Sequence, residues 1–297
     1  MMTGAWRNRK EQAIRAFFFL AGVSVILILG GIFVMLLTKG VKTFDEVSIG
    51  EFFFTTRWDP TSFVKPAYGI VGMALSTLLV TAGAMLIAVP LGIGTAAYLS
   101  DIAPYRVRDW LKPIIEMLAG IPSVAIGFIG IVLIGPVLAR MFGTSSGLNA
   151  LNGSILLAIM ALPTIVSITE DALRAVPKSY KEASYALGAN RWTTLVRVTI
   201  PAATPAIVAA IMLGIGRAIG ETMTVLMATG NALAMPSSIF DSVRTMTATI
   251  AIELGEVPYD TTHYYALFAV GAVLFVMSFV VNLIAELVTA KQRKYRL

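Results

Sequence analysis

Two charged residues lie in the middle of an otherwise apolar stretch, and they are the residues best suited to act on a substrate. Arg217 and Glu221 fall within residues 206–229, where a spacing of four places both on one face of a helix so that they can pair. A charge at the centre of a bilayer costs about 2.5–3.5 kcal/mol, so such residues normally face a bundle interior or a water-filled path. The planar guanidinium fork suits the oxygens of phosphate.

The carboxylate beside that arginine has two possible roles. Glu221 repels a fully ionised oxyanion, but it can accept a proton from hydrogen phosphate or hold the arginine between transport events. Thr222 adds a hydroxyl, and Gly216 and Gly220 allow another helix to approach closely. The alternative is a structural ion pair that stabilises helix packing. The cost of a charge in lipid favours the pathway interpretation.

A second candidate contact for an anion lies where a helix should break. Gly120-Ile121-Pro122-Ser123 interrupts the apolar stretch 113–138. If a half-helix begins near Ser123, its N-terminal amides favour an anion. A plain proline kink is the alternative, and it is the simpler interpretation.

The amino-acid composition indicates whether water or lipid surrounds the chain. The chain is 57% hydrophobic and only 13% charged, whereas a soluble domain is about a quarter charged. The absence of cysteine and the single histidine, His263, exclude disulfides, thiolate sites, cysteine nucleophiles and histidine-cluster metal sites. The net charge of +6 does not indicate nucleic acid, because the basic residues flank the apolar stretches. Lipid must therefore solvate much of the chain.

About 20 apolar residues cross a bilayer as a helix. Stretches that qualify are residues 17–37, 71–99, 113–138, 155–169, 206–229 and 264–288. The second must tilt, protrude or bend, with Pro90 as the expected bend point, and the third should be broken or kinked. The first follows basic residues but is too long for a signal sequence, so we expect an uncleaved span. The prediction is an all-α membrane protein with six transmembrane helices.

Lysine and arginine indicate how these helices are oriented. If the spans alternate from an inside N-terminus, most basic residues fall in inside segments, which predicts that both termini are cytoplasmic. The outer segment 41–68 is longer than a tight turn. A second outer segment, 238–253, has a helical pattern with Ser238 and Asp241 as a capping pair. That helix either lies on the membrane surface or lines the pathway.

The inner segment 177–201 predicts two short amphipathic helices. Ser179 and Glu182 fit a capping box at the start of the first helix. Gly188 should end it, and Asn190 can cap the second. Such helices either dock into a groove of a partner protein or lie flat in the lipid headgroups.

This segment resembles the EAA signature of bacterial ABC importer permeases. The match consists of Glu182-Ala183-Ser184, Gly188 and Ile200-Pro201, with a serine in place of the second alanine. In that family the loop is the coupling helix that seats in the nucleotide-binding subunit. The resemblance implies contact with an ATPase for Glu182, Ala183, Gly188 and Trp192.

Further motifs, from about Tyr68 to the C-terminus, resemble phosphate-specific permeases of the PstC type. They are Ala119-Gly120-Ile121-Pro122-Ser123, Leu162-Pro163-Thr164-Ile165, the run 216–223, and Gly230-Asn231 a few residues after that run. The resemblance implies a MetI-like bundle and a channel shared with a PstA-type subunit. It also implies two copies of an ATP-binding subunit, an extracytoplasmic phosphate-binding protein, and roles in transport for the residues at 217 and 221.

The chain lacks the Gly-x-x-x-x-Gly-Lys-Ser/Thr loop, so ATP and magnesium should bind a partner and this chain should hold no cofactor. We expect residues 1–67 to form the N-terminal cytoplasmic segment, first span and outer segment, and 68–297 the permease core with coupling loop 174–201. The expected location is the bacterial cytoplasmic membrane. The alternatives are a permease for another oxyanion, a PstA-type subunit, an ATP-independent anion transporter and, least favoured, a membrane enzyme.

Overall fold

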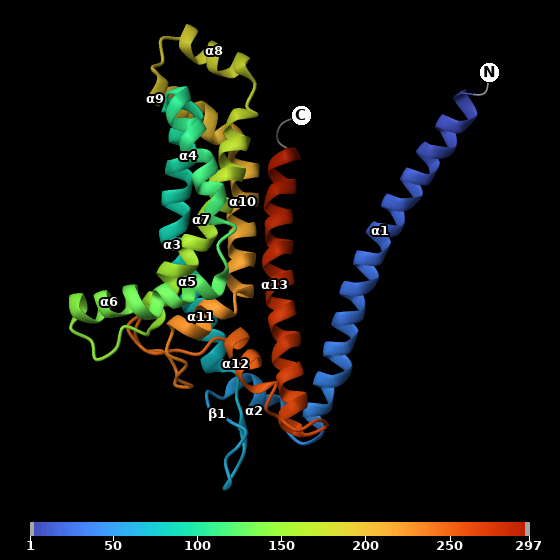
Figure 1. The fold of residues 1–297 in the computed structure, drawn as a ribbon, viewed down its shortest axis with the longest axis vertical. Helices are drawn as coiled ribbons and strands as arrows, with labels where there is room; N and C mark the ends of the chain where they lie inside the picture. The colour runs from blue at the N-terminus through green and yellow to red at the C-terminus, as the bar shows by residue number, and fades with distance from the viewer. Residues whose placement is uncertain (1–2, 295–297) are drawn as a thin grey trace.

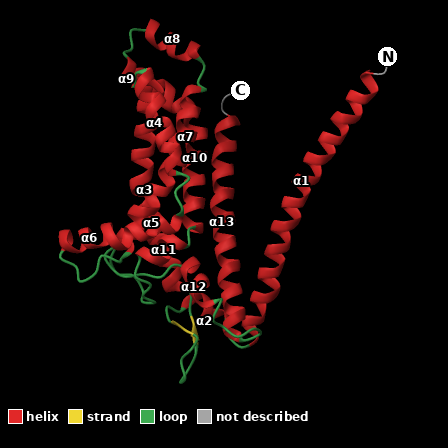
Figure 2. Cartoon of the chain, in the orientation of Figure 1, coloured by secondary structure: helices red, strands yellow, loops and turns green. Residues whose placement is uncertain are grey.

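The computed structural model describes residues 3–294, and almost all of its regular structure is helical (Figures 1 and 2). The long helices are α1 (Thr3–Gly40), α3 (Val71–Ala97), α7 (Ala150–Arg174), α10 (Ile200–Gly220) and α13 (Thr262–Lys294). Within the described part, six helical stretches are long and apolar enough to cross a membrane. The ends of α1 and α13 nearest the termini lie toward the same end of the molecule as α8 (Lys178–Ala186) (Figure 1).

Small residues bring the central helices together. Helix α3 packs along α7, and α10 packs on α7 and α13. Val80, Ala84 and Ala88 of α3 form one buried cluster with Leu157 and Ala161 of α7. Helices with small side chains at the contact approach closely and gain van der Waals contact that lipid cannot replace. Helix α3 is continuous through its internal proline.

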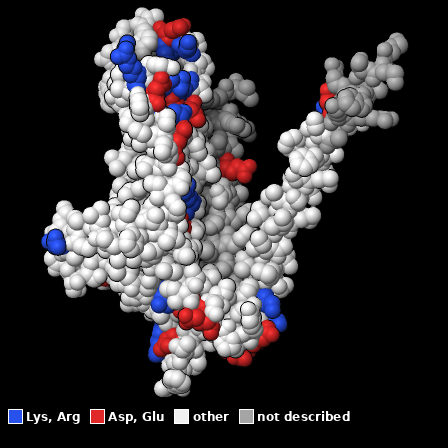
Figure 3. All heavy atoms as spheres, viewed as in Figure 1, with Lys and Arg blue, Asp and Glu red and all other residues white. Residues whose placement is uncertain are grey.

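Helix α1 diverges from the bundle and keeps its apolar side chains exposed (Figure 1). Its close contact with α13 is at Gly40, where an added Cβ would lie 2.9 Å from the Cα of Ala269. An apolar groove of about 580 Å³ lies between α1, the segment after it and α13. Figure 3 shows charged side chains mainly at the two ends of the molecule, so the flanks present an apolar surface suited to lipid or to another membrane helix.

The third apolar stretch differs from its predicted bounds. Helix α4 (Tyr105–Leu118) ends before the glycine and proline, and α5 (Ser123–Ile129) begins after them. The π-helical segment η3 (Gly130–Ile134) and α6 (Gly135–Phe142) follow, with α6 lying across the bundle (Figure 1). The apolar helical stretch is therefore Ser123–Phe142. The predicted break is confirmed, since α4 and α5 are separate helices. Its physical reason is that proline disfavours helical backbone in the residue before it.

The turn before α7 depends on a buried glycine. A Cβ added to Gly147 would collide with the backbone of Gly135, while the Gly147 carbonyl accepts a hydrogen bond from Asn152 Nδ2 at 3.0 Å. We expect Gly147→Ala to lower the free energy of unfolding by about 1–3 kcal/mol, because backbone must shift to admit the methyl group. Thermal unfolding of the purified protein in detergent measures this. Gly22→Ala is the control, since its Cβ would meet nothing within 4 Å, and equal midpoints for both variants would contradict the prediction.

At the opposite end from α8 lie short elements. They are η1 (Val41–Asp45), α2 (Ile49–Phe54), α12 (Met246–Glu253), and the antiparallel strands β1 (Trp58–Asp59) and β2 (Ala67–Tyr68). The helix predicted over 238–253 is thus shorter, and its capping pair is wrong. Thr245 caps α12 by accepting from the Ala248 amide. Asp241 instead closes a turn, where bonds from the Ser237 hydroxyl and from two backbone amides lower the pKa of its carboxyl.

Candidate functional site

The helix that carries Arg217 ends before it reaches Glu221. Helix α10 stops at Gly220, Glu221 has extended backbone with φ −70° and ψ 130°, and α11 begins at Met223 and runs to Ala228. The predicted pairing on one continuous helix is therefore wrong. Among the described residues no ion pair joins Arg217 to Glu221, and both side chains are half-buried. The helix ends here for two reasons. Gly220 is a weak helix former, and the Glu221 carbonyl accepts a hydrogen bond from outside the helix.

Hydroxyl groups from three segments surround the break. Thr247 Oγ1 of α12 donates to the Glu221 carbonyl at 2.9 Å, and Thr224 Oγ1 lies 3.4 Å from the Glu221 carboxylate. Thr77, Thr245 and Thr247 line, with Glu221, a narrow gap that is too small to hold a water molecule. These buried threonines were missed by the sequence reasoning. The available signal was the alternation of threonine through an otherwise apolar segment, Thr245-Met246-Thr247-Ala248-Thr249.

The second predicted break lies beside the first. Helix α5 begins at Ser123 and packs against α11, and the two lie together at the lower end of α10 (Figure 1). Thr224 Oγ1 lies 3.2 Å from the Ser123 carbonyl as well as near Glu221. Thr222 occupies the break itself, where its hydroxyl lies 3.4 Å from the Gly220 carbonyl. The structure therefore brings Ser123 and Glu221 together through Thr224.

Interrupted membrane helices commonly form the sites of transporters. The unwound backbone there exposes amides and carbonyls that can contact a substrate, provided that they line a cavity or are buried in protein. Here two interruptions meet beside the Glu221 carboxylate, and Arg217 lies in the last turn of α10 before the second of them. The described residues contain no group of three or more histidine, cysteine, aspartate or glutamate side chains placed to hold a metal ion.

The predicted coupling segment forms two short helices beyond the bundle, α8 and α9 (Arg191–Thr194) (Figure 1). Gly188 has φ +83°, a conformation that suits glycine, and Asn190 accepts from the Thr193 amide at 2.8 Å, so both predicted signals are confirmed. The predicted capping box is wrong, because α8 already begins at Lys178 after Pro177, and no side chain caps it. Proline is favoured at a helix start, where its missing N–H is no loss.

This segment presents an unusual amount of exposed apolar surface. The predicted coupling residues Glu182, Ala183, Gly188 and Trp192 are all exposed. Trp192 is 65% exposed and Leu187 is 89% exposed. None of the predicted coupling side chains is needed to fill the core of this chain, so they are free to contact another molecule.

Polar contacts hold α8 to the bundle. Lys181 Nζ lies 2.5 Å from Asp101 Oδ1 in the π-helical segment η2 (Tyr98–Ile102), and both side chains are largely buried. The Ser184 hydroxyl lies 2.9 Å from that of Thr194, which gives the serine in the EAA-like motif a structural role. These contacts connect α8 to the segment that follows α3 and, through α9, to the segment that leads into α10.

A buried carboxylate ties α4 to α7 nearby. Glu170 is 1% exposed and lies 2.5 Å from Lys112 Nζ and 3.3 Å from a nitrogen of Arg174. Lys112 also reaches Asp171 at 2.9 Å. A buried charge requires such compensation, and removing one partner is strongly destabilising. This cluster was not predicted from the sequence.

Comparison with known proteins places the chain among transport proteins. Residues 88–294 match the family described as "Binding-protein-dependent transport system inner membrane component". A Bacillus subtilis (strain 168) protein named "Probable ABC transporter permease protein YqgH" is 37% identical over 291 residues, covering 97% of this chain and 94% of that protein. The "Phosphate transport system permease protein PstC" of Mesorhizobium japonicum is 35% identical over 285 residues, covering 90% and 86%.

The fold is similar to that of a solved importer. A chain of a bacterial ABC transporter involved in the import of the acidic polysaccharide alginate superposes with a TM-score of 0.64 at 15% identity, covering 97% of this chain and 98% of that one. The family match extends over most of the chain, and the relatives align along nearly its whole length. The chain therefore belongs to the inner-membrane components of binding-protein-dependent transport systems, the multi-pass permease subunits of ABC importers, and within them to the PstC type.

Proposed function

We propose that this chain is the channel-forming subunit of an ATP-driven importer of inorganic phosphate, and that Arg217, Glu221, Thr222 and Ser123 line its pathway. The observation that carries this proposal is the meeting of two helix breaks beside an arginine that has no ion-pair partner among the described residues. An unpaired guanidinium inside a membrane bundle is costly unless it serves an anion. The PstC name of several relatives supports phosphate as that anion.

The partners follow from the same proposal. A PstA-type subunit completes the channel, and an extracytoplasmic protein delivers phosphate. Two copies of an ATP-binding subunit hold ATP and magnesium, and one of them docks on α8 and α9 of this chain. This chain itself holds no cofactor. The exposed surface of Glu182, Ala183, Gly188 and Trp192 supports the docking site. The end of the molecule with α8 and both termini then faces the cytoplasm, residues 68–297 form the permease core, and lipid covers the flanks.

Competition between oxyanions tests the substrate. Arsenate copies the shape and charge of phosphate, so an excess of arsenate should lower the uptake of labelled phosphate several-fold in cells that express the whole transporter. Sulfate and molybdate at the same concentration should leave uptake unchanged. Inhibition by sulfate alone would defeat the assignment of phosphate, and uptake that persists with an inactive ATPase would indicate an ATP-independent transporter.

A further inference from the structure

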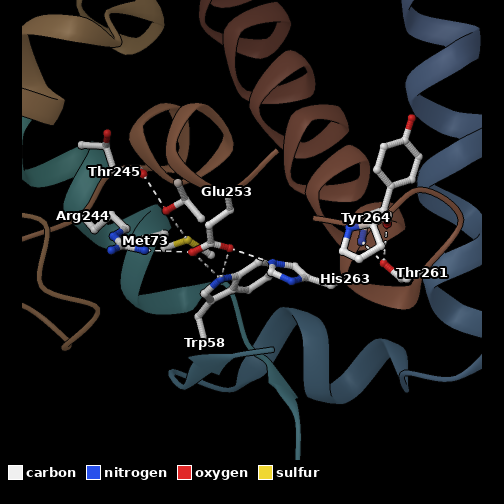
Figure 4. A network of polar contacts seen from close by, with 10 residues as sticks. Trp58, Met73, Arg244, Thr245, Glu253, Thr261, His263 and Tyr264 are labelled. Carbon is white, nitrogen blue, oxygen red and sulfur yellow. Dashed lines mark hydrogen bonds and ion pairs between the residues drawn. The ribbon is translucent and has the colours of Figure 1, made fainter. Parts of the chain in front are cut away.

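Four side chains from different segments meet at the end of α12 (Figure 4). The Glu253 carboxylate lies 3.0 Å from Trp58 Nε1, 2.8 Å from an Arg244 nitrogen and 2.8 Å from His263 Nε2. Trp58 is 2% exposed, and the other three side chains are 14–16% exposed. An ionised carboxylate only accepts hydrogen bonds, so it can accept from Trp58 and Arg244 and from the protonated form of His263 Nε2, whereas an amide in its place loses the charge that pairs with Arg244. We call this set the Glu253 clamp.

The Glu253 clamp joins the short elements at the end of the molecule opposite α8. Trp58 belongs to β1, and His263 lies in the first turn of α13. Arg244 also donates through Nε to the Asn231 carbonyl at 3.0 Å, just beyond α11. One carboxylate therefore holds the strand pair, the segment after α11 and the start of α13 against the last residue of α12. Such shared, partly buried charge networks are strongly interdependent.

The other end of α12 touches the candidate pathway. The Met246 amide donates to Thr77 Oγ1 of α3 at 3.1 Å, and Thr247 Oγ1 donates to the Glu221 carbonyl at 2.9 Å. Helix α12 has eight residues, which corresponds to a rod of about 12 Å. A short helix moves as a unit, so a change in the position of Glu253 shifts Thr247 and with it the backbone of Glu221.

We propose that Glu253 is a positioning residue for transport: its carboxylate fixes α12, and α12 fixes the break between α10 and α11. This inference rests on the proposed function, in which that break lines the pathway. Glu253 does not touch the substrate. Its effect passes from the clamp through Thr247 to Glu221.

Thiol labelling tests the position of the break directly. The chain contains no cysteine, so Thr222→Cys introduces a single reactive thiol. In the assembled transporter in intact cells, adding Glu253→Gln should change the labelling rate of that thiol by a membrane-impermeant maleimide about tenfold, because the amide removes the charge that pairs with the largely buried Arg244. Glu256→Gln is the matched control, an exposed glutamate in the same segment, and it should leave the labelling rate unchanged.

Uptake supplies the second measurement, without the cysteine. Glu253→Gln should lower the maximal rate of phosphate uptake about tenfold and leave the half-saturating concentration unchanged, and Glu253→Asp should restore part of the rate because it keeps the charge. Thr247→Val added to Glu253→Gln should cost little more, since both changes interrupt the same chain of contacts. If Glu253→Gln does not assemble, Trp58→Phe provides the test instead. It removes only one donor of the clamp, and it should also shift the labelling rate.

An unchanged labelling rate in both Glu253→Gln and Trp58→Phe would overturn the proposal, and so would losses of uptake that multiply with Thr247→Val. Failure of the proposed function is a separate result. Normal uptake by an Arg217 variant would contradict the proposed pathway. The labelling rate would still report whether the clamp positions the break.

Discussion

Replacing Arg217 with glutamine should reduce phosphate uptake by about a hundredfold or more while the transporter still assembles. The guanidinium is half-buried and has no ion-pair partner among the described residues, so its charge is available to an anion. A neutral amide offers fewer donors and no charge, and losing one such group typically costs about 10²–10³ in rate. Initial rates of labelled phosphate uptake measure the loss, and copurification of the subunits measures assembly.

Two further variants define the cause. Arg217→Lys keeps the charge but loses the planar fork, so it should retain part of the uptake. Arg140→Gln removes an exposed arginine from α6 and should leave uptake unchanged. If Arg217→Gln transports phosphate normally, the arginine serves only the packing of the helices.

Substitutions at the tip of α8 should separate this chain from its ATPase. Glu182 is exposed and no contact within the described chain needs it, so Glu182→Lys should leave the fold intact and repel a complementary partner surface. Gly188→Trp should have the larger effect, because φ is +83° there and the side chain would project into open space on the docking surface. Both variants should lose copurification of the ATP-binding subunit or abolish substrate-dependent ATP hydrolysis.

The controls for this prediction separate charge, bulk and backbone strain. Gly188→Ala introduces the unfavourable φ without bulk and should lose less activity than tryptophan. Glu256→Lys makes the same charge change at the other end of the molecule and should leave ATPase binding unchanged. Intact copurification with full uptake in Glu182→Lys and Gly188→Trp would contradict the docking surface.

The sequence predicts the parts of this fold that depend on local chemistry. Apolar length identifies the helical spans, the glycine–proline pair before Ser123 identifies a break, and Gly188 and Asn190 mark helix ends correctly. Each of these features follows from one residue and its immediate neighbours, so a single sequence contains enough information to find it.

The wrong predictions have other causes. Arg217 and Glu221 have the spacing of a helical pair, but Thr247 bonds to the Glu221 carbonyl from a segment that the local pattern does not connect with it. At Ser238 the competing contact is local: Asp241, three residues further on, accepts from the Ser238 amide and fixes a turn where the residue types suit a helix cap. At Glu221 a long-range contact overrides local propensity, which is why the candidate pathway was recognised by its residues but not by its geometry.

Two π-helical segments contact the α8 region, one after α3 and one before α10, and they affect how this chain tolerates insertions and deletions. Besides η2, the segment η4 (Leu195–Thr199) leads directly into α10. A π turn holds one residue more than an α turn, so a deletion within η4 can be absorbed by closing it to α-helix. The same deletion inside α10 would rotate every later side chain by about 100° and carry Arg217 off its face. Single-residue gaps between homologous sequences are therefore expected at these segments and not within the helices that they join.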